Sequence, residues 1–295
     1  MAPILPLILV LLVQPAAPIG TGAAGDVPTV RSLTFAAVDE KGVPIEGLTR
    51  DDVAVLENGV ARDLTLLEPD RRPLTVALLL DTSRPVASEF RLHVIPAAVA
   101  FVRRLPEGSR YAIWATGDRP TKLVDYTSDP EQAGRALRRV ILDGGNTLLD
   151  ALIEAPADMK KQEGGRNVVV AVTGSGIGFA NSDRQRVVDQ AAKSGAMFMS
   201  VVFDEGGGPE DSRDQQTVGR VDYDFVLSGL AERTGGLRET TLSSMGVGSS
   251  LDKIADDLKS RYRLSYATLP DAKTSKLEVK VARPGVKVRV GPAIR

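Results

Sequence analysis

Three loops of this sequence place polar side chains directly after apolar runs. Asp81 and Ser83 follow LTVALLL, Thr147 lies within DGGNTLLDAL at 143–152, and TGSGIG at 173–178 closes NVVVAVT. Open α/β sheets bind their ligands beyond the carboxyl ends of the strands. A carboxylate and two hydroxyls at such an edge are groups that contact a ligand. The sequence therefore predicts that these three loops lie at one rim of a parallel sheet.

Each of these residues also has an alternative role in folding. Ser83 can cap the helix that follows, with Pro85 tolerated in its first turn. Thr147 and Asp150 fit a capping box before an apolar run. Asp81 can accept backbone hydrogen bonds at the end of its strand. The pattern alone leaves both interpretations open.

Other site chemistries find little support in the sequence. TGSGIG departs from a dinucleotide loop because Phe179 occupies the third glycine position. It departs from a nucleophile elbow because Thr173 stands two residues before Ser175. A hydrolase would rest on Asp81 and neighbouring carboxylates, with no helper base or oxyanion arrangement. Cysteine is absent and His93 is the single histidine. We therefore predict that the chain is not an enzyme.

Composition limits the class of partner. The 295 residues carry 37 basic and 38 acidic side chains, for a formal net charge of -1. A balanced charge gives no electrostatic attraction for a polyanion. We expect no nucleic-acid partner.

Apolar runs and amphipathic stretches alternate through the middle of the chain. Strands are expected at LTVALLL, YAIWATG, NVVVAVT and AMFMSVVF, and an acidic, glycine-rich loop at 204–222. Alternation of this kind predicts a doubly wound, mostly parallel α/β sheet. Helices are expected near 88–105, 131–141, 147–162, 183–195, 224–234 and 247–260.

The two ends of the chain are rich in β patterns. VRSLTFAAV and a hairpin at Asn58-Gly59 precede the apolar run at Leu74, and RYRLSYAT, SKLEVKVA and VKVRV follow Lys259. Three carboxyl-terminal strands are too few for a core of their own. We predict one small all-β unit built from both ends, with segments 27–72 and 261–295 flanking an α/β domain at 73–260.

The first 25 residues are apolar and then small, as in a secretory leader. Their apolar core is too short to span a bilayer. The sequence therefore predicts a signal peptide at 1–25, a secreted, periplasmic or envelope location, and no integral membrane segment in the mature chain.

The ordered set of motifs resembles the von Willebrand factor A family, and in particular a related family that is abundant in acidobacteria. The motifs include GVPIEGLTRDDVAVLENGV, PLTVALLLDTS, GGNTLLDAL, LAERTGG, IADDLKSRYRLSY and LEVKVARPGVKVR, which together span about 30 to 291. The resemblance implies a Rossmann-like fold and a metal-ion-dependent adhesion site. Asp81 and Ser83 match the first loop of that site, and Thr147 matches its distant threonine.

Two positions depart from the family's metal site. Pro85 stands where a second serine belongs, and Gly174 stands where an aspartate is expected. Mg²⁺ requires near-octahedral geometry and one or two carboxylates. We therefore expect a degenerate site that holds no cofactor, or only weakly bound Mg²⁺, on a protein-binding or adhesion module. The sequence does not identify the partner protein. The alternative is a structural or assembly protein that uses its β unit for contacts and no metal.

Overall fold

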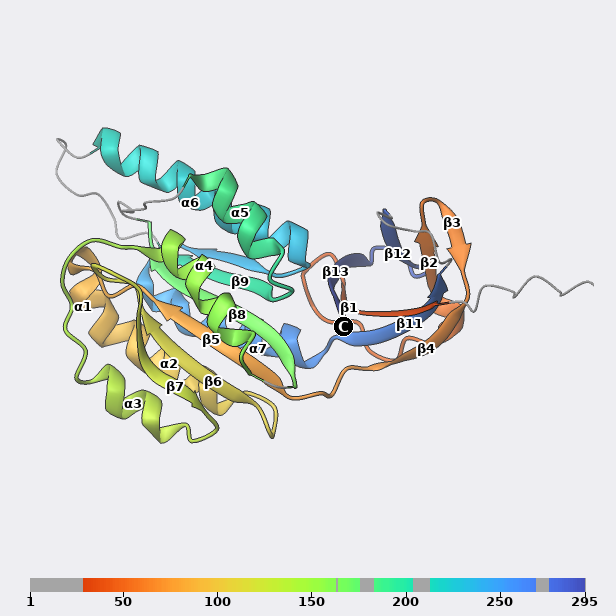
Figure 1. The fold of residues 1–295 in the computed structure, drawn as a ribbon, viewed down its shortest axis with the longest axis horizontal. Coiled ribbons are helices and arrows are strands. Elements are labelled where there is room, and N and C mark those ends of the chain that lie inside the picture. The colour runs from red at the N-terminus through yellow and green to blue at the C-terminus, as the bar shows by residue number, and fades with distance from the viewer. Residues whose placement is uncertain (1–28, 163, 176–182, 204–212, 269–275, 295) are drawn as a thin grey trace, which may run out of the picture.

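The chain forms two units that lie side by side, an α/β unit and a smaller β unit (Figure 1). The computed structural model describes residues 29–162, 164–175, 183–203, 213–268 and 276–294, with the backbone alone for 213–222. The leader at 1–25 lies outside the described residues, as do residues 176–182 of the loop after TGS.

The α/β unit is built on a six-stranded sheet of order β10-β9-β8-β5-β6-β7. All neighbours are parallel except β6 and β7, which pair antiparallel at one edge. The strands are β5 (Leu74–Leu80), β6 (Arg110–Ala115), β7 (Thr121–Thr127), β8 (Arg166–Gly174), β9 (Met197–Phe203) and β10 (Arg238–Thr241). The structure and its mostly parallel sheet confirm the predicted fold class.

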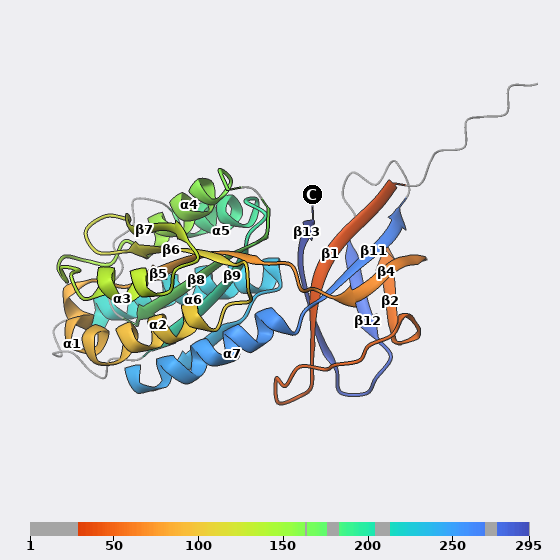
Figure 2. The same ribbon diagram turned by 90° about the horizontal axis from the view of Figure 1, so that it is seen from below.

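Helices cover both faces of this sheet (Figure 2). One face packs against α2 (Ile95–Arg103), α3 (Glu131–Leu137) and α7 (Val247–Lys259). The other packs against α4 (Leu148–Met159), α5 (Arg184–Ala192) and α6 (Arg213–Thr234). Because both faces are covered, every residue of β5 is buried, and successive side chains enter opposite cores. This explains why LTVALLL is apolar throughout.

The stretch before β6 is helical but irregular. It comprises a 3₁₀ turn (Arg84–Val86), α1 (Ala87–Glu89), a π turn (Phe90–Val94) and α2. Pro96, which lacks an N–H, stands in the first turn of α2, directly after the π turn. Residues Arg84–Arg103 are apolar and long enough to cross a membrane, but core helices of soluble proteins pass the same test. Phe90, Val94 and Phe101 of this stretch lie in the core of the α/β unit.

The β unit contains strands from both ends of the chain. A four-stranded sheet has the order β13-β1-β11-β4, and a three-stranded sheet has the order β12-β2-β3. The strands are β1 (Thr29–Val38), β2 (Val53–Glu57), β3 (Val60–Arg62), β4 (Leu64–Pro69), β11 (Tyr262–Thr268), β12 (Leu277–Val281) and β13 (Lys287–Ile294), with a 3₁₀ turn (Arg50–Asp52) before β2. Phe35, Val55, Leu264 and Val279 share one core. The predicted association of the two chain ends is thus present.

The chain passes between the units twice. Residues 70–73 join β4 to β5, and residues 260–261 join α7 to β11. Between them lies an ionic network in which buried Arg261 donates to Asp257 at 2.7 Å and to the Gly235 carbonyl at 2.7 Å. Arg289 of β13 also pairs with Asp257. Buried charges joined in this way fix the β unit against the end of α7.

Four elements differ from the sequence prediction. The antiparallel edge strand β7 and the short strand β10 were not foreseen. The loop expected at 204–222 ends early, because helix α6 begins at Arg213. A further 3₁₀ turn (Ser244–Gly246) precedes α7.

Candidate functional site

The candidate site lies where the direction of strand succession reverses. From β5 the chain moves to β6 and β7 on one side of the sheet, and it then returns to β8 on the other side. Loops that leave β5 and β8 diverge at that point and open a crevice at the carboxyl edge. Asp81 follows β5 directly, and Thr173 and Gly174 end β8. The fold therefore places Asp81 at the position where such sheets bind ligands.

Asp81 is buried and accepts hydrogen bonds on both carboxylate oxygens. Oδ1 accepts from the backbone N–H of Ser83 at 3.0 Å and from its hydroxyl at 2.6 Å. Oδ2 accepts from Asn146 Nδ2 at 2.8 Å, and from the Gly174 N–H and Thr173 Oγ1, each at 3.1 Å. One carboxylate thus joins the loops after β5 and β8 to the segment before α4.

Asn146 completes this network. Besides donating to Asp81, its Nδ2 lies 2.8 Å from Thr173 Oγ1. Its Oδ1 accepts from Thr116 Oγ1 at 2.7 Å and from the Leu148 N–H at 3.0 Å. The Leu148 bond caps the first turn of α4. Asn146 therefore links three strand ends and one helix start in a buried position.

The hydroxyls of Ser83 and Thr147 do not cap helices. Each residue precedes a helical turn, but neither side chain bonds that turn. Thr147 Oγ1 donates to the Gly117 carbonyl at 2.8 Å, and the Thr147 N–H donates to the Thr116 carbonyl at 2.7 Å. The capping interpretation is wrong for both side chains, whereas the expected backbone bonds to Asp81 are present. Thr147 and Ser83 both lie on this rim, each in contact with a different strand-end loop.

Neighbouring carboxylates are engaged elsewhere. Asp143 is exposed and forms an ion pair with Arg84, which lowers the pKa of its carboxyl. Asp183 accepts from the N–H groups of Gln185 and Arg186 at the start of α5. Neither residue contributes to the network around Asp81.

The donor set does not fit a tightly held Mg²⁺. Both oxygens of Asp81 are occupied by protein donors, and Pro85 and Gly174 bring no ligating side chain. Burial raises the pKa of Asp81 above its usual value, against the opposing effect of the hydrogen bonds from Ser83, Gly174 and Thr173. Among the described residues, no group of three or more His, Cys, Asp or Glu side chains is placed to hold a metal ion.

Exposed apolar side chains border the same end of the sheet. Leu242 and Met245 follow β10 and are 94% and 74% exposed, and Leu92 of the π turn is 67% exposed. The 242–246 loop is held beside α1 because Ser244 donates to the Glu89 carboxylate. Apolar groups left in water on one face are typical of a surface that binds another protein.

Asn146, Thr116 and Thr173 were not among the predicted site residues. Asn146 stands beside Thr147 in GGNTLLDAL, and Thr116 and Thr173 end apolar strands. The sequence feature that would have predicted them is their position next to the ends of buried strands. A polar residue that ends a buried parallel strand must find its hydrogen-bond partners at the same rim.

The comparisons agree with this architecture. Residues 76–177 match the family model described as von Willebrand factor type A domain. The proximal thread matrix protein 1 from the mussel byssus, solved with a zinc-occupied MIDAS motif, is 17% identical with a TM-score of 0.51 over 67% of this chain. This chain covers 48% of that protein. At this identity the likeness shows the fold alone.

Two bacterial structures are also similar. The von Willebrand domain of the type V pili tip protein Mfa5 from Porphyromonas gingivalis is 10% identical, with a TM-score of 0.49 and coverage of 64% of this chain and 95% of that one. The conserved hypothetical protein BatB from Bacteroides thetaiotaomicron is 15% identical, with a TM-score of 0.46 and coverage of 63% and 99%. No curated protein matches the sequence.

Proposed function

We propose that the protein, whose residues 76–177 match the family model of the von Willebrand factor type A domain, is a secreted or envelope-associated binding module with no catalytic activity. Its partner is another protein, bound at the carboxyl rim that carries Asp81, Ser83 and Thr147. The leader-like segment at 1–25 supports export.

The proposal rests on the hydrogen bonding of Asp81, because both of its carboxylate oxygens already accept from donors of the protein. Five contacts from four residues use its carboxylate within the fold. A general base or nucleophile needs a free lone pair directed at substrate, and here the lone pairs are directed at protein donors. The rim is therefore organised as a fixed surface, and exposed Leu242 and Met245 beside it supply the apolar contact area that a protein partner requires.

The metal site on this rim is degenerate in our proposal. It binds no divalent ion, or binds Mg²⁺ only weakly, because one buried carboxylate and two hydroxyls supply too little charge. Millimolar Mg²⁺ or Mn²⁺ should leave the melting temperature unchanged within about 1 °C, since a ligand at or below its dissociation constant stabilises the fold very little. A rise of several degrees, abolished by Asp81→Asn, would contradict the degenerate site.

The interaction surface is tested by capture of partners from the source organism's own extract. The wild-type protein should retain a partner equally well with and without a chelator. Leu242→Asp combined with Met245→Asp should abolish capture without changing the melting temperature, because both side chains are exposed and make no core contacts. Val60→Asp, at an exposed apolar residue of the β unit, is the matched control.

The Leu242/Met245 double variant and Val60→Asp also distinguish the proposed function from the alternative, an assembly role of the β unit. An assembly protein that uses its β unit would lose capture with Val60→Asp and keep it with the double rim variant. Strand β3, which carries Val60, and strand β13 are each the edge of a sheet and would be the pairing strands. Part of the β13 edge is already in contact with the α/β unit, since Arg289 donates to the Gly236 carbonyl at 2.8 Å. This contact favours the rim over the β unit as the binding surface.

A further inference from the structure

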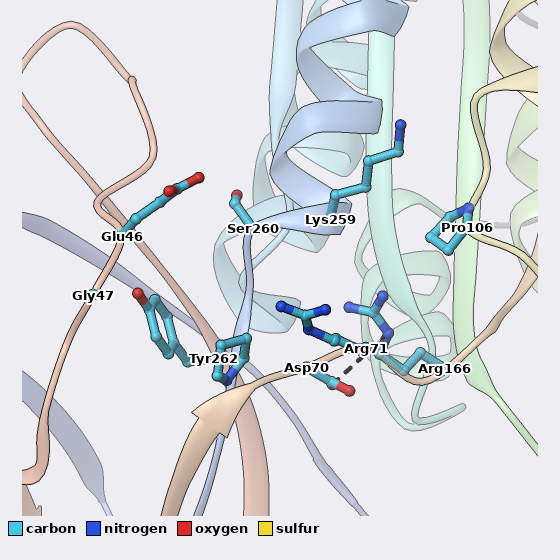
Figure 3. Close-up of a pocket in the computed structure, with 10 residues that line it drawn as sticks. Glu46, Gly47, Asp70, Arg71, Pro106, Arg166, Lys259, Ser260 and Tyr262 are labelled. Atoms are coloured by element: carbon cyan, nitrogen blue, oxygen red, sulfur yellow. Dashed lines mark ion pairs between the residues drawn. The ribbon is translucent and has the colours of Figure 1, made fainter.

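A cavity of about 400 Å³ lies at the junction of the two units, away from the carboxyl rim (Figure 3). The α/β unit lines it with Pro106, Arg166 and Lys259, and the β unit lines it with Glu46 and Tyr262. Both connections between the units, at 69–71 and at 259–262, form part of its wall. Clefts between units are common places for small-molecule sites.

The charge of this cavity is predominantly positive. Arg71 and Lys259 line it and form no ion pair within the described part of the chain. Asp70 also lines it, but both of its oxygens already accept from Arg72, at 2.9 and 2.7 Å. Glu46 is the remaining carboxylate in the wall. Arg166 Nε lies 3.7 Å from Asp70 Oδ2, in the ion pair drawn in Figure 3. The two cations without an ion pair, Arg71 and Lys259, thus face one unpaired anion, Glu46.

Arg166 lies in the wall of the cavity and has one unsatisfied donor. Its side chain is 6% exposed, Nη1 donates to the Leu258 carbonyl at 2.9 Å, and Nε donates to the Arg72 carbonyl at 3.2 Å. Nη2 is buried and has no hydrogen-bond partner among the described residues. A buried guanidinium N–H without an acceptor carries an uncompensated desolvation cost. Burial lowers the pKa of Arg166 to about 10, which leaves it cationic at neutral pH.

The neighbouring helix end does not oppose an anion here. Helix α7 ends at Lys259, and its carbonyl groups give that end a partial negative charge. The Leu258 carbonyl accepts a hydrogen bond from Arg166, and the Asp256 carbonyl accepts from the Ser260 N–H at 3.1 Å. In Figure 3 the side chains of Arg71 and Arg166 lie between Tyr262 and Pro106, below Lys259.

We propose that this junction cavity binds a small molecule through an oxyanion group, a phosphate or a carboxylate, held by Arg71, Arg166 and Lys259. Arginine presents paired N–H donors that match both groups. The ligand contacts both units at once, because Tyr262 and Glu46 belong to one unit and Arg166 and Pro106 to the other. Binding therefore stabilises the two units against each other.

The proposal is tested with inorganic phosphate and, separately, with acetate, at an ionic strength held constant with sodium chloride. At least one anion should raise the melting temperature of the full chain in a saturable way. The expected rise is about 3 °C at tenfold excess over the dissociation constant. Response to phosphate alone identifies a phosphorylated ligand, and response to acetate alone identifies a carboxylic acid.

Variants then locate the binding. Arg71→Ala combined with Lys259→Ala should weaken anion binding at least tenfold in calorimetry, because both side chains are exposed and neither is needed for the fold. Glu46→Gln should tighten binding several-fold, since it removes the unpaired carboxylate. Arg119→Ala, at an exposed arginine on the opposite end of the α/β unit, is the control and should leave binding unchanged.

Either of two results would overturn the site. One is the absence of saturable binding of both anions to the wild-type protein. The other is equal binding to the Arg71/Lys259 double variant and to Arg119→Ala, which would assign the effect to general exclusion of the salt from the protein surface. Neither result affects the proposed partner surface at the carboxyl rim.

Discussion

Asn146 is the residue that joins the strand-end loops of the candidate site to one another. Its amide is the only side chain described at the rim that contacts Asp81, Thr116, Thr173 and the start of α4 together. An amide serves this role because it presents donors and acceptors at the same position. Aspartate there would place a second carboxylate against Asp81, and leucine would remove all four of these hydrogen bonds.

Asn146→Ala should lower the free energy of unfolding by about 3 kcal/mol, because four buried hydrogen bonds of roughly 1 kcal/mol each are lost and the pocket relaxes only in part. Urea unfolding measures the change. Asn167→Ala is the control, since Asn167 Oδ1 has no hydrogen-bond partner among the described residues. If Asn146→Ala lowered the free energy of unfolding no more than Asn167→Ala does, the result would contradict the central role of Asn146.

The two departures from the family's metal site can be reversed together. Pro85→Ser with Gly174→Asp restores a hydroxyl and a carboxylate at the positions where the resemblance expects them. We expect this variant to gain several degrees of melting temperature in millimolar Mg²⁺, because a second carboxylate supplies the charge that one buried Asp81 lacks. The matched control carries Asp81→Asn in addition and should lose the response. An unchanged melting temperature in both variants would show that more than these two side chains separates this rim from a metal site.

At the scale of elements, glycines occupy two contrasting positions. Gly59 lies in the hairpin turn between β2 and β3 with φ of +80°, next to Asn58 with φ of +53°. Both central residues of a type I′ turn require such values, which asparagine tolerates and glycine adopts at no steric cost, whereas alanine is strained there. Gly248 lies in the first turn of α7, where a Cβ would meet nothing within 4 Å.

Gly59→Ala should therefore destabilise the protein by about 1 kcal/mol, whereas Gly248→Ala should stabilise it by about 0.5 kcal/mol through a less flexible unfolded chain. Equilibrium unfolding in urea distinguishes the two signs. Destabilisation by both substitutions would contradict the open space that the structure gives to Gly248.

Strands buried on both faces were the elements best predicted from sequence. β5, β8 and β9 are continuous apolar runs, and a run of that kind between polar loops has few other structures available to it. β7 was missed because its pairing depends on the neighbouring β6 and not on its own mixed composition, TKLVDYT. β10, with the sequence RETT, is a strand only because β9 pairs with it.

The candidate site was predictable only in outline. That Asp81, Ser83 and Thr147 follow strands can be read from the sequence, and the family resemblance placed them on one site. Which donors reach Asp81 depends on how the loops after β5, β6 and β8 cross at the rim, and this crossing is a property of the folded sheet. The direction of the Asn146 amide has no sequence signal at all.

At the scale of the whole molecule, Asp70 is the acidic residue of the connection between the units. It is 1% exposed and accepts two hydrogen bonds from the Arg72 guanidinium and one from the Arg72 N–H, and Arg166 Nε lies 3.7 Å from its Oδ2. Burial alone would raise its pKa, but the hydrogen bonds and charges of Arg72 and Arg166 outweigh burial and lower it. A carboxyl whose pKa is lower in the folded state stabilises the fold above its unfolded pKa, and this contribution is lost as pH falls through the folded pKa.

Asp70→Asn should lower the free energy of unfolding by about 3 kcal/mol at pH 7, because it leaves Arg72 and Arg166 without their buried counter-ion. The difference from wild type should shrink as pH falls from about 4 towards 2, where the wild-type carboxyl itself becomes protonated. Chemical unfolding across this range measures it, with Asp125→Asn, at an exposed residue, as the control. A difference that does not change with pH would contradict the role of the charge.

The position of β1 has a consequence for biosynthesis. This strand lies between β11 and β13, so both of its neighbours in the sheet are translated more than 200 residues after it. During translation, β1 cannot pair with β11 or β13 until the complete α/β unit has been synthesised. Its backbone hydrogen bonds to these strands are therefore absent throughout that time. A nascent chain halted after residue 260 should therefore hold a protease-resistant α/β core and a protease-sensitive amino-terminal arm, and chaperones that bind exposed strands should find their target there until the final strands are synthesised.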